Sequence, residues 1–244
     1  MQLQSERLNR VFFKELLASD FFSINSVLVT PTCARCSRLF GIGELKKEER
    51  RGNITNLKIS DSTATLNIYT NKTIRLQEPE KDFMAFVGKL HVRADKGRGF
   101  IILVEEAAAV NEEARNNWIL TTAKRTMERI EQLRRLEKNA LAKKHWAREA
   151  IEHYAIDDDR LDALADMAIN AVRNVLLYYS KTAGEIILEV LEAADKNGMK
   201  REKLTTELEK KGLTGESIEE ALEYLIAEGS CYEPEVGIVR VVEQ

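Results

Sequence analysis

The chain has 244 residues, of which 44% are hydrophobic and 32% are charged, and its formal net charge is -3. This composition is typical of a soluble globular protein with room for two modest domains. No apolar run approaches the roughly 18 residues of a membrane span, and the start, MQLQSERLNR, lacks a signal-peptide pattern. Three cysteines are too few for a disulfide framework, so we expect a cytoplasmic protein in a reducing compartment.

The first segment predicts a short helix from Ser5 to Ala18. Its apolar residues fall at helical spacing, and Ser5 is the candidate N-cap. The face that would be buried consists of Leu8, Val11, Phe12 and Leu16.

The stretch PTCARC follows, in which Cys33 and Cys36 have the spacing of half a zinc site. A structural zinc site takes four Cys or His ligands, but the third cysteine is far along the chain and the three histidines are scattered. A thioredoxin-like pair needs a helix after its first cysteine, whereas the strand-like SRLFGIGELK follows here. We therefore expect no metal, and two small, buried or half-buried residues at the start of a strand.

Five strands are predicted between Arg38 and Glu106. Residues 38–46, 53–60 and 63–70 are short strand-like segments separated by polar turns. A short helix is expected near Pro79, after which FVGKLHVRAD and GFIILVEE form a hairpin across Lys96 and Gly97. Five strands with a helix between the third and the fourth are the order of an OB-fold barrel.

After Glu105 the apolar period changes from two to about 3.6. Residues 111–154 contain no Gly or Pro and predict one long amphipathic helix, whose stripe is Met127, Ile130, Leu133, Leu136, Ala140, Ala147 and Ile151. Residues 155–179 start with acidic residues and are expected to fold back as a helix or to lead into the last domain. Their stripe is Leu161, Leu164, Met167, Ala171, Val175 and Tyr178.

The last segment predicts three helices that end at Gly198, Gly212 and Gly229, followed by a two-stranded wing in CYEPEVGIVRVV. This is the winged-helix pattern. The expected fold is therefore α+β, with an N-terminal OB-fold β-barrel domain over residues 1–108, a helical connector and assembly segment over residues 109–180, and a C-terminal winged-helix domain over residues 181–244.

Two basic clusters in the predicted barrel could hold the phosphates of a nucleic-acid single strand, because OB-folds bind strands with their hairpin loops and barrel face. The first cluster is expected in the loop after the first strand, and glutamates interleave it, so a merely solvated turn is the alternative. The second is expected at the tip between strands four and five. The two clusters are Lys46, Lys47, Arg50 and Arg51, and Arg93, Lys96 and Arg98.

Aromatic and imidazole rings that could stack on bases are Tyr69, His91 and Phe100. An aromatic side chain on a strand also packs in cores, and this alternative stays open for Tyr69 and Phe100.

Three stretches, RVFFKELLASDF, FMAFVGKLHV and WILTTAKRTMERIEQL, resemble the archaeal replication protein A-associated family, whose members are similar to the middle subunit of replication protein A. The resemblance covers residues 10–133. It implies single-stranded DNA binding in replication and repair, other replication protein A subunits as partners, and a winged helix that recruits replication or repair proteins. It also implies that helices after the barrel hold partner subunits, here through Met127, Ile130, Leu133 and Leu136. The cysteine pair is not part of the family pattern.

Charge is distributed unevenly along the chain. Residues 1–107 carry 17 Lys and Arg against 13 Asp and Glu, whereas residues 181–244 carry 8 against 15. A winged helix that enters DNA presents a basic third helix, but this one, GESIEEALEYLIAEG, is acidic and would be repelled by phosphates. It suits a basic segment of another protein better.

No dinucleotide loop, phosphate loop, nucleophile pattern or metal pattern occurs in the sequence. We therefore predict a protein that is not an enzyme and needs no cofactor. The first hypothesis is a single-stranded DNA-binding subunit. The alternatives are an assembly adaptor with little DNA contact of its own and a winged-helix transcription regulator, the latter disfavoured by its acidic third helix.

Overall fold

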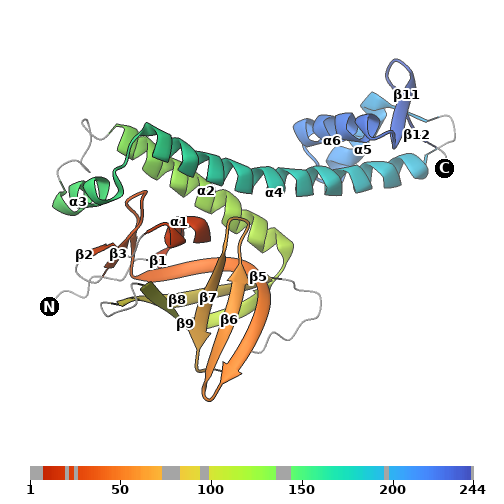
Figure 1. The fold of residues 1–244 in the computed structure, drawn as a ribbon. Helices are drawn as coiled ribbons and strands as arrows, with labels where there is room; N and C mark the ends of the chain where they lie inside the picture. Colours follow the sequence, from red (N-terminus) through yellow and green to blue (C-terminus); the bar gives the residue numbers. More distant parts are fainter. Residues whose placement is uncertain are drawn as a thin grey trace. The chain divides into compact units, whose positions relative to one another are not determined.

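The computed structural model describes residues 8–19, 22–24, 27–72, 83–93, 99–135, 144–194 and 198–242. The chain forms two compact units, Met1–Val172 and Arg173–Gln244. Figure 1 shows their elements in colours that follow the sequence. None of the helices in these described ranges is long and apolar enough to cross a membrane.

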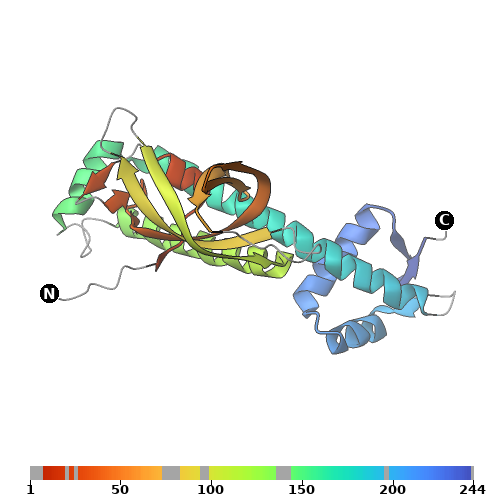
Figure 2. The same cartoon turned by 90° about the horizontal axis from the view of Figure 1, so that it is seen from below.

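Five strands of the first unit close into a barrel: β5 (Arg38–Arg51), β6 (Ile54–Ser60), β7 (Thr65–Thr70), β8 (Phe83–Arg93) and β9 (Gly99–Val110). Their order is β5-β6-β7-β9-β8, and β8 pairs back with β5. All these pairs are antiparallel except β7 with β9. The closed sheet curls round on itself in Figure 2. The α+β class and an OB-like barrel, predicted from the sequence, are therefore confirmed.

Apolar side chains at alternate strand positions fill the barrel, among them Leu39, Leu57, Ile59, Leu66, Ile68, Met84, Phe86, Leu90 and Ile102. The packing is close enough to require glycine at position 41, because a Cβ there would lie 2.5 Å from Cε1 of Phe86. Gly41 thus allows the ring of Phe86 to pack closely against the backbone of β5. The helix expected near Pro79 and the hairpin tip at Lys96 and Gly97 lie outside the described residues.

The helix predicted from Ser5 to Ala18 is shorter than expected. Leu8 and Asn9 form β1 (Leu8–Asn9), which pairs in parallel with Arg38 and Leu39 of β5. Only α1 (Phe13–Leu17) is helical, and Ser5 lies outside the described residues. Pairing with β5 provides hydrogen-bond partners for the backbone groups of β1. Strand pairing therefore prevails over the helix that the spacing of apolar residues predicts.

A small antiparallel sheet, which the sequence did not predict, follows α1. It consists of β2 (Ser23–Ile24), β3 (Val27–Val29) and β4 (Arg35–Cys36), in that order. Residues 31–34 of the PTCARC stretch therefore form the turn between β3 and β4, Arg35 and Cys36 form β4, and the first barrel strand starts two residues later.

The single long helix predicted over residues 111–154 is wrong. Helix α2 (Glu112–Arg134) starts at Asn111, whose side chain accepts a hydrogen bond from the Ala114 amide at 3.0 Å, and α3 (His145–Tyr154) is a separate helix. Ile130 of α2 and Tyr154 of α3 belong to one buried cluster. On a straight helix these two residues would lie about 36 Å apart, so burial of the cluster requires the break.

Helix α4 (Asp158–Glu192) carries the second predicted stripe, and Leu161, Met167, Ala171 and Val175 are buried on it. Its first turn contains Asp158 and Asp159, as favoured at a helix N-terminus. Leu161 and Ala165 join the cluster of Ile130 and Tyr154.

The second unit contains the end of α4, then β10 (Met199–Lys200), α5 (Arg201–Lys210), α6 (Gly215–Ala227), β11 (Cys231–Glu235) and β12 (Ile238–Val241). The strands form a sheet in the order β10-β12-β11. Its own core consists of Ala183, Ile187, Leu191, Leu204, Leu208, Ile218, Ala221, Leu222, Leu225, Cys231 and Val239. The helices predicted to end at Gly212 and Gly229 and the hairpin are present, and β10 adds a third strand that the sequence did not predict. The helix predicted to end at Gly198 is not a separate helix, because it continues the helix of the second predicted stripe as α4, which ends at Glu192.

Candidate nucleic-acid interface

The outward side of the barrel carries a row of side chains that crosses four strands. Asn56 of β6 pairs with Tyr69 of β7, Tyr69 with Leu103 of β9, and Leu103 with Lys89 of β8. Their neighbours along the strands are buried, as the alternation of strand residues requires. Tyr69 is half-buried, whereas Leu103 is 46% exposed. A phenol ring and an exposed leucine side chain therefore lie next to each other on the outside of the barrel.

Basic and polar side chains surround this pair. Lys58 and Asn67, paired across β6 and β7, are exposed. His91 is exposed and pairs with the half-buried Ile101. We call this set the strand face: Asn56, Lys58, Asn67, Tyr69, Lys89, His91, Ile101 and Leu103.

Sequence reasoning found Tyr69 and His91 of the strand face and missed the others. The signal was the polar residue at every second position of NITNLKIS and TLNIYT, which marks the outward side of both strands.

The first predicted basic cluster lies on a strand and not in a loop. β5 continues to Arg51, and its register with β6 runs to the Arg51–Ile54 pair, which closes around the turn at Gly52, where φ is 61°. Charged side chains are tolerated because residues 46–48, 50 and 51 at this end of β5 are all exposed to solvent. The predicted loop is therefore corrected to a tight two-residue turn.

Two of these cations are engaged by carboxylates. Lys46 Nζ lies 2.5 Å from Glu44 Oε1, and Lys47 Nζ lies 2.5 Å from Glu49 Oε1. The hydrogen bond from Lys47, followed by its charge, lowers the pKa of Glu49. Much of the positive charge at this end of β5 is thus balanced within the strand itself.

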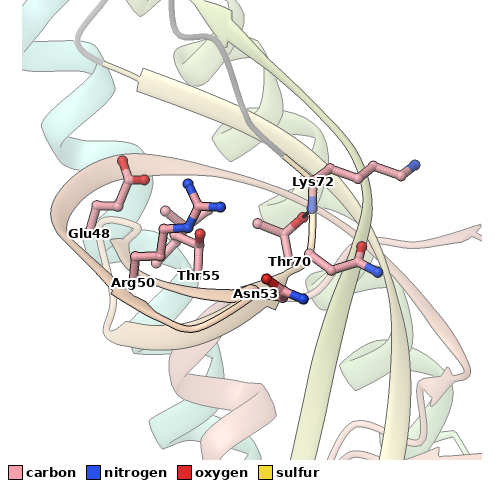
Figure 3. Close-up of a pocket in the computed structure, with 8 residues that line it drawn as sticks. Glu48, Arg50, Asn53, Thr55, Thr70 and Lys72 are labelled. Atoms are coloured by element: carbon pink, nitrogen blue, oxygen red, sulfur yellow. Dashed lines mark hydrogen bonds between the residues drawn. The ribbon is translucent and has the colours of Figure 1, made fainter.

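Arg50 instead lines a small polar hollow at the end of the barrel, drawn in Figure 3. Its cross-strand partner is the buried Thr55, which in turn pairs with the buried Thr70. The Arg50 guanidinium Nε donates to the Gly52 carbonyl at 3.3 Å. The other lining residues are Glu48, Asn53, Leu57, Asn71 and Lys72. Hydroxyl, amide and guanidinium groups here could hydrogen-bond a phosphate or a base edge.

Lys72 extends away from this group in Figure 3. Its Nζ donates to the backbone carbonyl of Glu105 at 2.6 Å, and the Glu105 carboxylate accepts from Arg38 at 2.6 Å. Lys72 thus ties the end of β7 to β9.

The remaining predicted contacts are placed only in part. Phe100 lies on the same side of β9 as the buried Ile102 and is half-buried. Lys96 and Arg98, together with the side chain of Arg93, lie outside the described residues. The second basic cluster therefore stays a prediction.

Two of the four residues of the predicted partner-binding stripe are covered by other parts of this chain. Ile130 is 1% exposed and Leu133 is 6% exposed, and both pack with Tyr154 of α3. Met127 is 37% exposed, and Leu136 lies outside the described residues. Packing against α3 and α4 of this same chain thus accounts for the burial of Ile130 and Leu133.

Cys33 and Cys36 are buried, as the sequence predicted. Burial, followed by the nearby charge of Glu15, raises the pKa of both thiols to about 12. Neither thiol is a ready nucleophile or metal ligand in this state. Among the described residues, no three His, Cys, Asp or Glu side chains converge in a way that could hold a metal ion.

The turn that holds Cys33 is organised by a buried carboxylate that sequence reasoning missed. Glu15 of α1 is fully buried and accepts from the hydroxyls of Thr30 at 2.7 Å and Thr32 at 2.5 Å. Arg129 of α2 lies 3.1 Å from its Oε2. This cluster joins α1, the β3–β4 turn and α2.

No family model and no curated protein matches the sequence. Among solved structures, the chain is similar to part of a replication protein A heterotrimer bound to single-stranded DNA, with 11% identity, a TM-score of 0.41, and coverage of 50% of this chain and 98% of the other. The S. pombe Stn1-ten1 complex gives 11% identity, a TM-score of 0.33, and coverage of 60% and 98%. Asparaginyl-tRNA synthetase from Pyrococcus horikoshii has 17% sequence identity and a TM-score of 0.24. The match covers 43% of this chain and 31% of the synthetase chain. Because these scores are low, the barrel is assigned from its own strand order.

Proposed function

We propose that this chain is a non-catalytic subunit of a replication protein A-like complex and binds single-stranded DNA in replication and repair. The observation that carries the proposal is the strand face, where Tyr69 and Leu103 lie side by side among polar and basic residues. A single strand exposes bases that stack on flat apolar side chains and phosphates that attract cations. The hollow around Arg50 would add polar contacts at one end of that face.

The proposal is tested by fluorescence anisotropy of the chain with labelled oligo-dT over a salt series. Binding should weaken with salt, with a slope of about 0.7 for each phosphate contact. Tyr69→Ala should weaken binding by about 1–3 kcal/mol, because one stacked base is lost. The matched control is Tyr232→Ala on β11, which removes a tyrosine that is 39% exposed in the second unit. Equal losses in the two variants would contradict a role for the strand face.

The second candidate is an assembly adaptor whose barrel mainly holds partner subunits. It is favoured by the ion pairs of Lys46 and Lys47, which leave less free positive charge on β5. In this case the chain alone would bind no oligo-dT at low salt, and Tyr69→Ala would release a partner subunit.

We further propose that the three parts of the chain have different roles. Residues 1–108 bind DNA, and residues 109–180 assemble the complex. Residues 181–244 act as a winged helix that recruits other proteins. The observation behind the last assignment is the charge of α6. Glu219 is the partner of Arg201, whose other guanidinium nitrogen contacts Glu233 at 2.7 Å. Arg201, at the start of α5, is thus already paired with two glutamates. The other glutamates of α6 are Glu216, Glu220 and Glu223. This surface suits a basic peptide and repels phosphates.

Recruitment is tested with the isolated residues 173–244, which have a core of their own. They should bind a basic amphipathic peptide and leave duplex DNA unshifted at physiological salt. Glu220→Lys with Glu223→Lys should abolish peptide binding, whereas Glu202→Lys with Glu209→Lys on α5 should not. A shift of duplex DNA by the unaltered fragment would favour the transcription-regulator alternative.

A further inference from the structure

A second group of cations gathers on the first unit, outside the strand face. Arg10 follows β1, and its guanidinium carbon lies 4.8 Å from the ring centre of Phe40 on β5. Arg35 of β4 and Lys144 before α3 lie over the ring of Trp146, at 5.4 Å and 5.8 Å. Phe40 and Trp146 are half-buried, and Arg35 and Lys144 are exposed.

Strand β1 brings these two aromatic rings and their three cations together. Asn9 of β1 donates from Nδ2 to the Arg35 carbonyl at 2.7 Å, and Arg10 is the next residue. β1 also lies beside β5 in register, Asn9 opposite Leu39, which places Arg10 next to Phe40. Arg125 of α2 completes the group, because its charge acts on Arg10. We call these residues the cation–aromatic surface: Arg10, Arg35, Phe40, Arg125, Lys144 and Trp146.

These cations differ from most other arginines of the unit. Arg38, Arg115, Arg129 and Arg134 each contact a carboxylate. Within the described part of the chain, by contrast, no ion pair joins Arg10, Arg35, Arg125 or Lys144 to a carboxylate. Glu149, on the helix of Trp146, is engaged by His145 at 3.1 Å.

The surface therefore brings together four cations that form no ion pair with a carboxylate of the described residues. Burial, followed by the repulsion of Arg125, lowers the pKa of Arg10, which is the expected response of a guanidinium that lacks a counter-charge. An anion placed between the two arginines would relieve this repulsion. Cations spread over β1, β4, α2 and α3 fit an extended chain of phosphates better than one compact anion.

The surface is continuous with the strand face through β5. Arg38 of β5 pairs in register with Lys89 of the strand face, and Phe40 lies two residues further on the same side of β5. Glu105 of β9 is held by Arg38 at 2.6 Å, whereas the exposed Glu106 pairs with Val87, which is the partner of Phe40 on β8. A strand that leaves Lys89 could thus reach Phe40 along β5, with Glu106 as the exposed carboxylate beside this path.

We infer that Arg10, Arg35, Arg125 and Lys144 bind the phosphates of a nucleic-acid single strand beyond the strand face, with Trp146 as a ring on which a base stacks. This inference rests on the proposed function and deepens it, because it lengthens the footprint of the same strand. It also predicts that affinity depends on the length of the oligonucleotide.

The test compares oligo-dT of about 10 and about 30 nucleotides on the full chain. The variant Arg10→Gln, Arg35→Gln, Arg125→Gln, Lys144→Gln should bind the short oligonucleotide as the wild type does. For the long one its salt slope should fall by about 2–3, at about 0.7 for each lost phosphate contact. The control variant, Lys14→Gln, Arg134→Gln, Arg135→Gln, Arg160→Gln, removes four exposed cations elsewhere in the unit and should keep the slope.

Tryptophan fluorescence gives an independent readout. The chain has two tryptophans, and Trp118 is 2% exposed, so quenching by oligo-dT should report Trp146. Quenching by the long oligonucleotide should be lost in Trp146→Phe. A polyphosphate of equal charge should not quench, and equal quenching by it would overturn the assignment to nucleic acid.

The outcomes separate the two proposals. If the chain binds neither oligonucleotide, the proposed function fails and this inference fails with it. If the short oligonucleotide binds and the long one binds no more tightly, only the inference is overturned. The same holds if the salt slope falls equally in both four-residue variants.

Discussion

Replacing Arg129 by methionine is expected to lower the free energy of unfolding of the first unit by about 3–5 kcal/mol, because it leaves the buried carboxylate of Glu15 without its cation. Arg129 donates from Nε to the Thr32 hydroxyl at 2.7 Å and from Nη2 to Glu15 Oε2 at 3.1 Å. Glu15 is fully buried, so water cannot replace the lost partner. Urea unfolding monitored by Trp118 fluorescence in a Trp146→Phe background would measure the loss.

The matched control is Arg134→Met on the same helix. Arg134 contacts Asp162, whose side chain is 64% exposed. An ion pair of this kind contributes about 0–1 kcal/mol, so the control should change stability little. A loss below about 1 kcal/mol for Arg129→Met would show that the hydroxyls of Thr30 and Thr32 alone stabilise Glu15.

The Glu15 cluster also shows why part of the fold could not be predicted from the sequence. Glu15 and Arg129 are separated by 114 residues, and a glutamate within FFKELLA has the pattern of the solvated face of a helix. Only the arrangement of α1, the β3–β4 turn and α2 buries it. Similarly, β2 to β4 are strands of two or three residues, too short to produce a recognisable alternation.

The barrel was predictable because its signal is local. Alternation of apolar and polar residues in β6 and β7, and the hairpin of β8 and β9, follow from the two-residue period of strands. β5 ended too early in the prediction because charge dominates KKEERR, although these residues pair with β6 through Arg51. Strand pairing here outweighs the weak strand preference of lysine and glutamate.

The candidate site was predictable to a smaller extent. Tyr69 was identified from its residue type, but Leu103 was not, because nothing in GFIILVEE distinguishes an exposed leucine from its buried neighbours. The parallel pairing places Leu103 beside Tyr69 on the outward side of the barrel, where it is 46% exposed. Arg35 and Trp146 are likewise joined by tertiary structure, across more than a hundred residues of sequence.

The prediction of a single long helix failed because Ile130 of α2 is buried in a cluster together with residues of α3 and α4. A substitution at Ile130 should therefore lower the stability of the first unit strongly. Ile130 is 1% exposed in a cluster whose other members come from β3, the β3–β4 turn, α2, α3 and α4: Val29, Cys33, Leu133, Ala150, Tyr154, Leu161 and Ala165. Ile130→Glu would place an unpaired charge in this cluster and should lower the free energy of unfolding by more than about 4 kcal/mol. The control is Met127→Glu, one turn earlier on α2. Because Met127 is 37% exposed, this substitution should lower the free energy of unfolding only slightly.

Thiol labelling reports which unit the Ile130→Glu change opens. Cys33 and Cys36 are buried in the first unit, whereas Cys231 belongs to the core of the second. Burial raises the pKa of all three thiols, which protects them from alkylation in the folded chain. In Ile130→Glu we expect Cys33 and Cys36 to react while Cys231 stays protected, because the second unit keeps its own core. If instead all three thiols stay protected and a partner subunit dissociates, Ile130 contributes to assembly, as the family resemblance implies, and the intramolecular interpretation of the stripe is wrong.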